Sequence, residues 1–184
     1  MLKDLTIITG QLRIDKFTLE DVDDLFALMN QPAIMRFIPD RYRTKRELRK
    51  TLKWLISNYS MKPNEITRLS LGIRLKETNE LIGWVTYGPL PYDECLKEVA
   101  YAIDPAYWNQ GFATAAGKAF LQWLLKNVAD CDIYAQVNPE NHQSIRVLEK
   151  LGMAKVKADR LIKDRKPGEV WLYRLKKKTQ NHSS

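Results

Sequence analysis

A loop of small and polar residues at 107–116, with the sequence YWNQGFATAA, has the residue types that bind an anion. It follows a predicted strand at 98–103 and opens a predicted helix that runs through Lys126. The first N–H groups of a helix have no partner within it, and the helix dipole places partial positive charge beside them. Gly111 has no Cβ, so a phosphate can approach the backbone closely, and the Thr114 hydroxyl can add a donor. These features predict a phosphate-binding loop.

Cysteine and histidine offer little further chemistry in this sequence. Cys95 and Cys131 are too few for a disulfide framework and do not have metal-site spacing, so we expect no metal. Neither has a histidine close in sequence to activate it, which argues against an acyl-cysteine intermediate. Histidine is a frequent acid–base residue, but we expect His142 to lie on the surface.

Size and charge limit the classes of protein that this chain can represent. It has 184 residues, 45% of them hydrophobic, and a formal net charge of +8. We expect one domain over 1–184, with a core at about 11–175 and a flexible basic and polar tail at 176–184. No apolar run is long enough to span a bilayer, and the N-terminus lacks the apolar core of a signal peptide. With reduced thiols, this predicts a cytoplasmic protein.

Two capping-box sequences and one proline define the predicted early helices. Thr18 and Thr44 are each followed three residues later by a carboxylate, ahead of amphipathic helices that reach Met29 and Ile56. Pro32 either ends the first of these helices or begins a short second one. Two later helices are predicted from Gly111 onward and at about 141–151.

Alternating hydrophobicity predicts about seven strands, at 11–17, 67–75, 81–88, 98–103, 132–138, 154–162 and 169–175. Pro89 and Pro91 are expected to end the third of these strands, and Lys166-Pro167-Gly168 to form the last turn. The fold class is therefore α+β, with a central mixed, mostly antiparallel sheet of about seven strands flanked by about four helices.

Three segments of the chain resemble the GCN5-related N-acetyltransferase (GNAT) superfamily. Residues 99–114 resemble its acetyl-CoA signature, and residues 138–153 resemble its second cofactor motif. Leu12-Arg13-Ile14 ahead of a helix resembles the start of the ribosomal-protein N-terminal (alanine) acetyltransferase branch. The resemblance covers 11–175 and implies the acyl-CoA N-acyltransferase fold. Two positions depart from the superfamily, because Trp108 stands where Gln or Arg is frequent and Leu148 where many members have a proton-donating Tyr.

The resemblance implies a site for acetyl-CoA as co-substrate. Its pantetheine arm would run along 100–103, where Ala102 leaves room and a backbone N–H near Ile103 stabilises the oxyanion of the tetrahedral intermediate. Asn141 would bond to the pantetheine, although asparagine there also suits a helix N-cap. The pyrophosphate would be held by the backbone N–H groups of Asn109, Gln110, Gly111, Phe112, Ala113 and Thr114.

The same resemblance suggests two catalytic residues. Glu98 is the candidate general base that takes a proton from the acceptor amine, with a solvated strand-edge carboxylate as the alternative. Ser144 would lie near the sulfur and is the candidate proton donor to the thiolate, although solvent can also supply that proton. Small alanines at 100 and 102 are equally compatible with plain core packing.

The sequence therefore predicts an acetyl-CoA-dependent N-acetyltransferase that acts by direct attack in a ternary complex, most simply on a protein N-terminus. The alternatives are a small-amine acetyltransferase (aminoglycoside, polyamine or amino acid) and a non-catalytic acyl-CoA sensor. We expect no nucleic-acid partner, because the basic clusters lack interleaved aromatic residues, and no membrane partner. We expect the protein to be a monomer or a homodimer. A cluster of three arginines could face an acidic acceptor: Arg36, Arg41 and Arg43. Six apolar or aromatic residues are candidates for the walls of the acceptor site: Phe37, Ile38, Tyr42, Trp84, Tyr87 and Tyr173.

Overall fold

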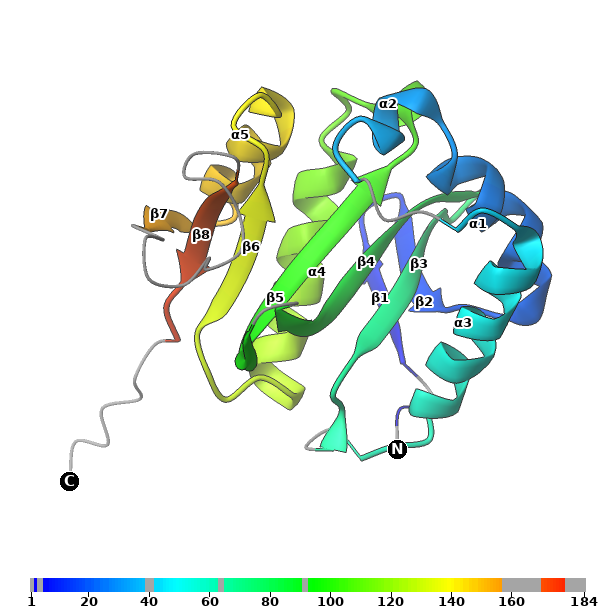
Figure 1. Ribbon diagram of the computed structural model, residues 1–184, viewed down its shortest axis with the longest axis horizontal. Coiled ribbons are helices and arrows are strands. Elements are labelled where there is room, and N and C mark those ends of the chain that lie inside the picture. Colours follow the sequence, from blue (N-terminus) through cyan, green and yellow to red (C-terminus); the bar gives the residue numbers. More distant parts are fainter. Residues whose placement is uncertain are drawn as a thin grey trace.

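The computed structural model describes residues 2, 5–38, 42–62, 65–90, 93–156 and 170–177. They form one eight-stranded sheet in the order β1-β2-β3-β4-β5-β6-β8-β7, in which only the β5–β6 pair is parallel (Figure 1). The strands are β1 (Thr6–Thr9), β2 (Leu12–Lys16), β3 (Leu69–Leu75), β4 (Leu81–Leu90), β5 (Asp93–Ile103), β6 (Ile133–Val137), β7 (Ala154–Val156) and β8 (Trp171–Leu175). The predicted mixed, mostly antiparallel sheet is confirmed.

Helices cover both faces of this sheet. One face carries α1 (Val22–Met29), α2 (Pro32–Met35) and α3 (Lys45–Asn58), and the other carries α4 (Phe112–Asn127) and α5 (His142–Lys150). Each face has its own core, because Phe17, Leu25 and Leu52 are buried under α1 and α3, whereas Phe120 and Leu124 of α4 are buried on the other side. Among the described residues, no helix combines the length and apolar character needed to cross a membrane.

The two capping boxes begin helical segments as predicted, because Thr18 caps a short 3-10 turn, Leu19–Asp21, that leads directly into α1, and Thr44 caps α3. Thr18 accepts a hydrogen bond from the backbone of Glu20, and its own N–H donates to Asp21 Oδ2 at 2.7 Å. Thr44 and Glu47 make the same reciprocal pair at the start of α3. Each box satisfies N–H groups that the first turn leaves without helical partners.

Three strand boundaries differ from the sequence-based expectation. The edge strand β1 was not predicted, because its four residues, TIIT, show no alternation of apolar and polar types. In the structure Ile7 packs on the core, whereas its neighbour Ile8 is 54% exposed. Strand β4 continues through Pro89, where the register with β5 shifts and the missing N–H is tolerated. Strand β5 begins at Asp93, five residues before the predicted start, and the predicted turn at 166–168 lies outside the described residues.

A buried ion cluster joins the first capping box to the sheet. Arg74 on β3 donates from Nη2 to Asp21 Oδ1 at 2.7 Å and from Nε to Asp15 Oδ1 at 3.1 Å. The side chains of Arg74 and Asp21 are only 9% and 8% exposed. Buried charges are stable only when they are paired and hydrogen-bonded, so each member of this cluster depends on the others.

We expect Arg74→Leu to lower the free energy of unfolding by about 3–5 kcal/mol, because it leaves Asp15 and Asp21 without their buried cation. Urea denaturation followed by circular dichroism measures the loss. The control is Lys45→Ala, which removes an exposed pair with Asp23 and should cost less than about 1 kcal/mol. Equal losses for the two variants would show that the buried cluster is not a stabilising unit.

The parallel pair β5–β6 is short and opens into a wedge. Paired residues are Lys97 with Ile133 and Glu98 with Tyr134, after which the two strands separate (Figure 1). The sheet therefore contains a gap beside residues 99–103, at the end of β5 that leads into the predicted phosphate-binding loop.

Candidate active site

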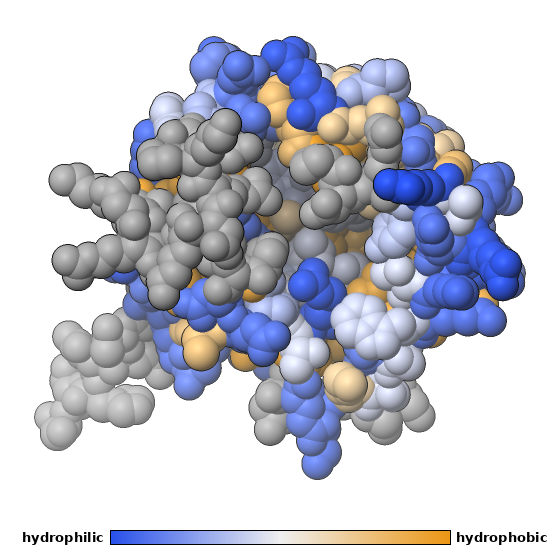
Figure 2. Space-filling model, in the orientation of Figure 1, coloured by the Kyte–Doolittle hydropathy of each residue, from blue (hydrophilic) through white to orange (hydrophobic). Residues whose placement is uncertain are grey.

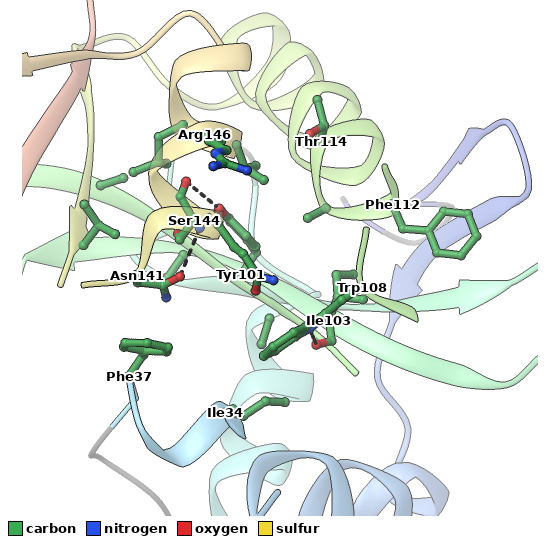
Figure 3. A pocket seen from close by; sticks show the side chains of 18 of the residues that line it. Ile34, Phe37, Tyr101, Ile103, Trp108, Phe112, Thr114, Asn141, Ser144 and Arg146 are labelled. Carbon is green, nitrogen blue, oxygen red and sulfur yellow. Dashed lines mark hydrogen bonds between the residues drawn. The ribbon is translucent and has the colours of Figure 1, made fainter. Parts of the chain in front are cut away.

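A cleft of about 350 Å³ lies in the wedge between β5 and β6. Its walls come from both strands, from the loop after β5, from the first turn of α4, from one side of α5, and from α2 (Figure 3). Most of the predicted site residues line it, namely Ala102, Ile103, Asn109, Gly111, Phe112, Ala113, Thr114, Asn141 and Ser144. The predicted site residues that do not line it are Gln110 and Glu98.

The loop 104–111 holds the start of α4 open toward the cleft. Trp108 Nε1 donates to the Ile103 carbonyl at 2.6 Å, and Asp104 accepts from the Ala106 N–H at 2.8 Å, which fixes the turn. Gly111 is the N-cap of α4 at φ +80°, and no atom outside its immediate neighbours lies within 4 Å of a Cβ built there. No side chain caps this helix N-terminus, so its first N–H groups face open space suited to an anion.

The first turn of α5 brings three polar groups together. Asn141 Oδ1 accepts from the Ser144 N–H at 3.0 Å, which confirms the N-cap role of Asn141. Tyr101 from β5 lies with its hydroxyl 2.9 Å from Ser144 Oγ and also donates to the Ser144 carbonyl at 3.3 Å (Figure 3). Burial raises the pKa of Tyr101 to about 12, so its phenol stays protonated at neutral pH.

Sequence reasoning did not single out Tyr101. The available signal was a tyrosine between two alanines of the predicted cofactor strand, since alternation places its ring on the opposite face from Ala100 and Ala102. Leu148, where a tyrosine is frequent in the superfamily, is 1% exposed and packs in the core. His142 is exposed and does not line the cleft, as expected.

Glu98 lies just below the opening of the wedge. Its Oε2 accepts from Gln136 Nε2 at 3.1 Å, and Gln136 itself lines the cleft. The unbroken register with β4 places Glu98 on the same sheet face as Ala100 and Ala102, which is the face of α1 and α3. The carboxylate therefore lies beside the cleft, on the side of α1 and α3.

The charge of the cleft fits a polyphosphate. Arg146 and Lys150 of α5 line it, and no carboxylate occurs among its described lining residues. No group of three metal-ligating side chains occurs in the described part of the chain. An anion at the α4 N-terminus would meet helix N–H groups in a cleft whose described lining adds two cations and no carboxylate.

The residues that the sequence suggested for binding the acceptor amine lie in different places. Phe37 and Ile38 line the cleft, whereas Tyr87 and Tyr173 are each 3% exposed and belong to the core. Arg36 pairs with Glu140 at 3.3 Å. Arg43 is exposed, and Arg41 lies outside the described residues.

Comparison with known proteins agrees with this geometry. The family model of the acetyltransferase (GNAT) domain matches residues 11–154. The chain belongs to the GNAT acetyltransferase family. It is an N-acetyltransferase, as the sequence predicted, and enzymes of this family use acetyl-CoA.

This GNAT acetyltransferase is similar in sequence to one protein described below and in fold to two solved structures. The uncharacterized N-acetyltransferase p20 of Bacillus licheniformis is 27% identical over 150 residues, which is 82% of this chain and 83% of p20. The ribosomal-protein-S5-alanine acetyltransferase of Vibrio fischeri shares the fold with a TM-score of 0.75 and 19% identity, over 95% of this chain and 97% of that one. Mycobacterium smegmatis RimJ, solved with a coenzyme A disulfide, has a TM-score of 0.74 and 18% identity, over 95% and 88%.

Proposed function

We propose that this GNAT enzyme moves the acetyl group of acetyl-CoA to the α-amino group of a protein or peptide N-terminus. The observation that carries the proposal is the cleft, whose described lining residues offer cations and apolar groups but no carboxylate. An acceptor with several positive charges, such as a polyamine or aminoglycoside, would find no carboxylate among these residues and only Glu98 beside them. An α-amine with a pKa of about 8 is partly neutral at pH 7 and can attack directly.

The described residues fit acetyl-CoA along the whole wedge. The N–H groups at the start of α4, behind Gly111, would hold the pyrophosphate, and Arg146 and Lys150 would lie near a phosphate. The amide groups of the pantetheine would pair with the free edge of β5 at 100–103, in place of the strand that β6 no longer supplies there. Bound in this way, acetyl-CoA supplies an activated acyl group.

Proton transfer would involve residues on both faces of β5. Glu98 would take the proton of the attacking amine, directly or through one water, from the α1–α3 face. Ser144 would donate toward the leaving sulfur, and Tyr101 would act as a positioning residue that holds the Ser144 hydroxyl at 2.9 Å. A backbone N–H near Ile103 would stabilise the oxyanion.

We expect Ser144→Ala to lower kcat by about 10-fold, less than the usual effect of a proton donor, because a thiolate of pKa about 8.5 leaves readily without help. Tyr101→Phe should cost less alone and almost nothing in the Ser144→Ala background, since it acts through that hydroxyl. Steady-state kinetics of the two single variants and the double variant measure this coupling. Independent, multiplicative effects would show that Tyr101 does not act through Ser144.

Release of free coenzyme A thiol from acetyl-CoA across an acceptor panel tests the proposed function. The panel contains peptides with free N-termini, the same peptides with blocked N-termini and an internal lysine, polyamines and aminoglycosides. Turnover of free but not blocked peptides supports the proposal. Turnover of small amines alone, or tight acetyl-CoA binding without any turnover, contradicts it.

A further inference from the structure

A second cavity, of about 240 Å³, lies on the sheet face that carries α1 and α3. Its walls are mostly apolar side chains of α1 and α3 together with aromatic residues, and they include Leu25, Met29, Leu48, Leu52, Tyr42 and Trp84. Figure 2 shows this side of the molecule, with some hydrophobic residues exposed near its centre. The cavity is larger than the engineered apolar cavity of about 150 Å³ that binds benzene in another protein, so it has room for an aromatic or branched side chain.

The second cavity lies next to the acetyl-CoA cleft. Ile38 lines both. Two of its floor residues, Trp84 and Thr86 on β4, are the direct cross-strand partners of Ala102 and Ala100 on β5, which line the cleft. Since paired residues in neighbouring strands lie about 5 Å apart, a group bound in the cavity would be adjacent to a reacting amine at the cleft.

The described residues in the cavity wall include no carboxylate. Ser70 Oγ and Thr86 Oγ1 are hydrogen-bonded to each other at 2.8 Å, and Thr86 also donates to the Leu69 carbonyl at 3.0 Å. The buried Trp84 Nε1 has no acceptor in the described part of the chain. Arg68 is the one charged residue among the described lining residues, and it would repel a positively charged group.

We infer that this cavity binds the uncharged, apolar side chain of the acceptor's first residue, so that the enzyme prefers N-termini that begin with Leu, Ile, Met or Phe. The inference rests on the proposed function and narrows its substrate class. An apolar side chain would exclude water from a wall that is mostly apolar, whereas a serine side chain would bury little apolar area and a lysine side chain would bring its charge beside Arg68.

A matched peptide series tests this inference, with one sequence that begins in turn with Ser, Ala, Lys, Leu or Phe. We expect kcat/KM for the Leu and Phe peptides to exceed that for the Ser peptide by about 30-fold, within the range known for apolar pockets. Equal or higher values for Ser, Ala or Lys overturn the inference but leave N-terminal acetylation intact. If no free N-terminus is acetylated, the proposed function fails as well, and the binding experiment below then decides separately whether the cavity takes the side chain.

Two further measurements locate the preference in this cavity. The indole N–H resonance of Trp84, assigned with Trp84→Phe, should shift on titration with the Leu peptide in the presence of coenzyme A, and an unmoved resonance overturns the assignment of the site. Thr51 on α3 lines the cavity, so Thr51→Phe should reduce the Leu-over-Ser ratio by about 10-fold. The control is Lys53→Phe, which adds the same ring to an exposed position of α3 and should keep that ratio.

Discussion

Gly111→Asp should weaken acetyl-CoA binding by about 1000-fold, the largest effect that we expect from a single substitution. Gly111 is the N-cap of α4 at φ +80°, with open space around the missing Cβ. A carboxylate there would occupy the position proposed for the pyrophosphate. Two like charges about 4 Å apart near a protein surface repel by about 4 kcal/mol, which corresponds to this loss.

The matched control is Gly111→Asn, which has nearly the same shape without the charge. Both Asp and Asn tolerate a positive φ better than other residues with a side chain, and both are good N-cap residues, so each variant should fold. Isothermal titration with acetyl-CoA measures affinity, and thermal melting checks the fold. We expect about a 10-fold loss for asparagine, from the steric term and loss of close approach. Similar losses for the two variants would show that no phosphate group binds at this helix end.

The second large effect concerns the proposed base. We expect Glu98→Gln to lower kcat/KM by about 100- to 1000-fold at pH 7, within the usual contribution of a general base. The amide can keep the contact with Gln136, so folding should be unaffected. The control is Glu94→Gln on the same strand, an exposed position away from the cleft, which should leave the rate unchanged.

The pH profile separates a base from a structural carboxylate. Above pH about 9 most α-amino groups are neutral, since their pKa is about 8, and the acceptor no longer needs a base. The deficit of Glu98→Gln should therefore shrink as pH rises from 7 to 9.5. A deficit that is constant with pH, or smaller than about threefold at pH 7, would leave Glu98 as a strand residue hydrogen-bonded to Gln136.

Local signals predicted the parts of the site that depend on neighbouring residues in sequence. Gly111 and Asn141 are helix N-caps, and their residue types and the following helical patterns indicate this directly. The two capping boxes were predicted for the same reason. The edge strand β1 and the passage of β4 through Pro89 depend on which neighbours pair with them, which the chain does not encode locally.

Contacts between distant segments were beyond the sequence. Tyr101 and Ser144 are 43 residues apart, and their hydrogen bond follows from how α5 packs beside β5. The second cavity forms where α1, α3 and β4 meet around Trp84, and these elements are distant in sequence. The sequence could therefore suggest Trp84 only as one possible wall residue of the acceptor site. Tyr87 and Tyr173 had the same residue-type signal as Tyr42 but are buried in the core.

The short β5–β6 ladder has a consequence for hydrogen exchange. In a strand, successive amides alternate between its two edges, and β4 already bonds one edge of β5 through Ile103. Beyond Glu98 the edge toward β6 has no ladder, so every second amide at 99–103 should exchange quickly while its neighbours are protected. Acetyl-CoA bound along this edge would slow the fast set alone, and that alternation would distinguish an added strand from a general stiffening of the sheet.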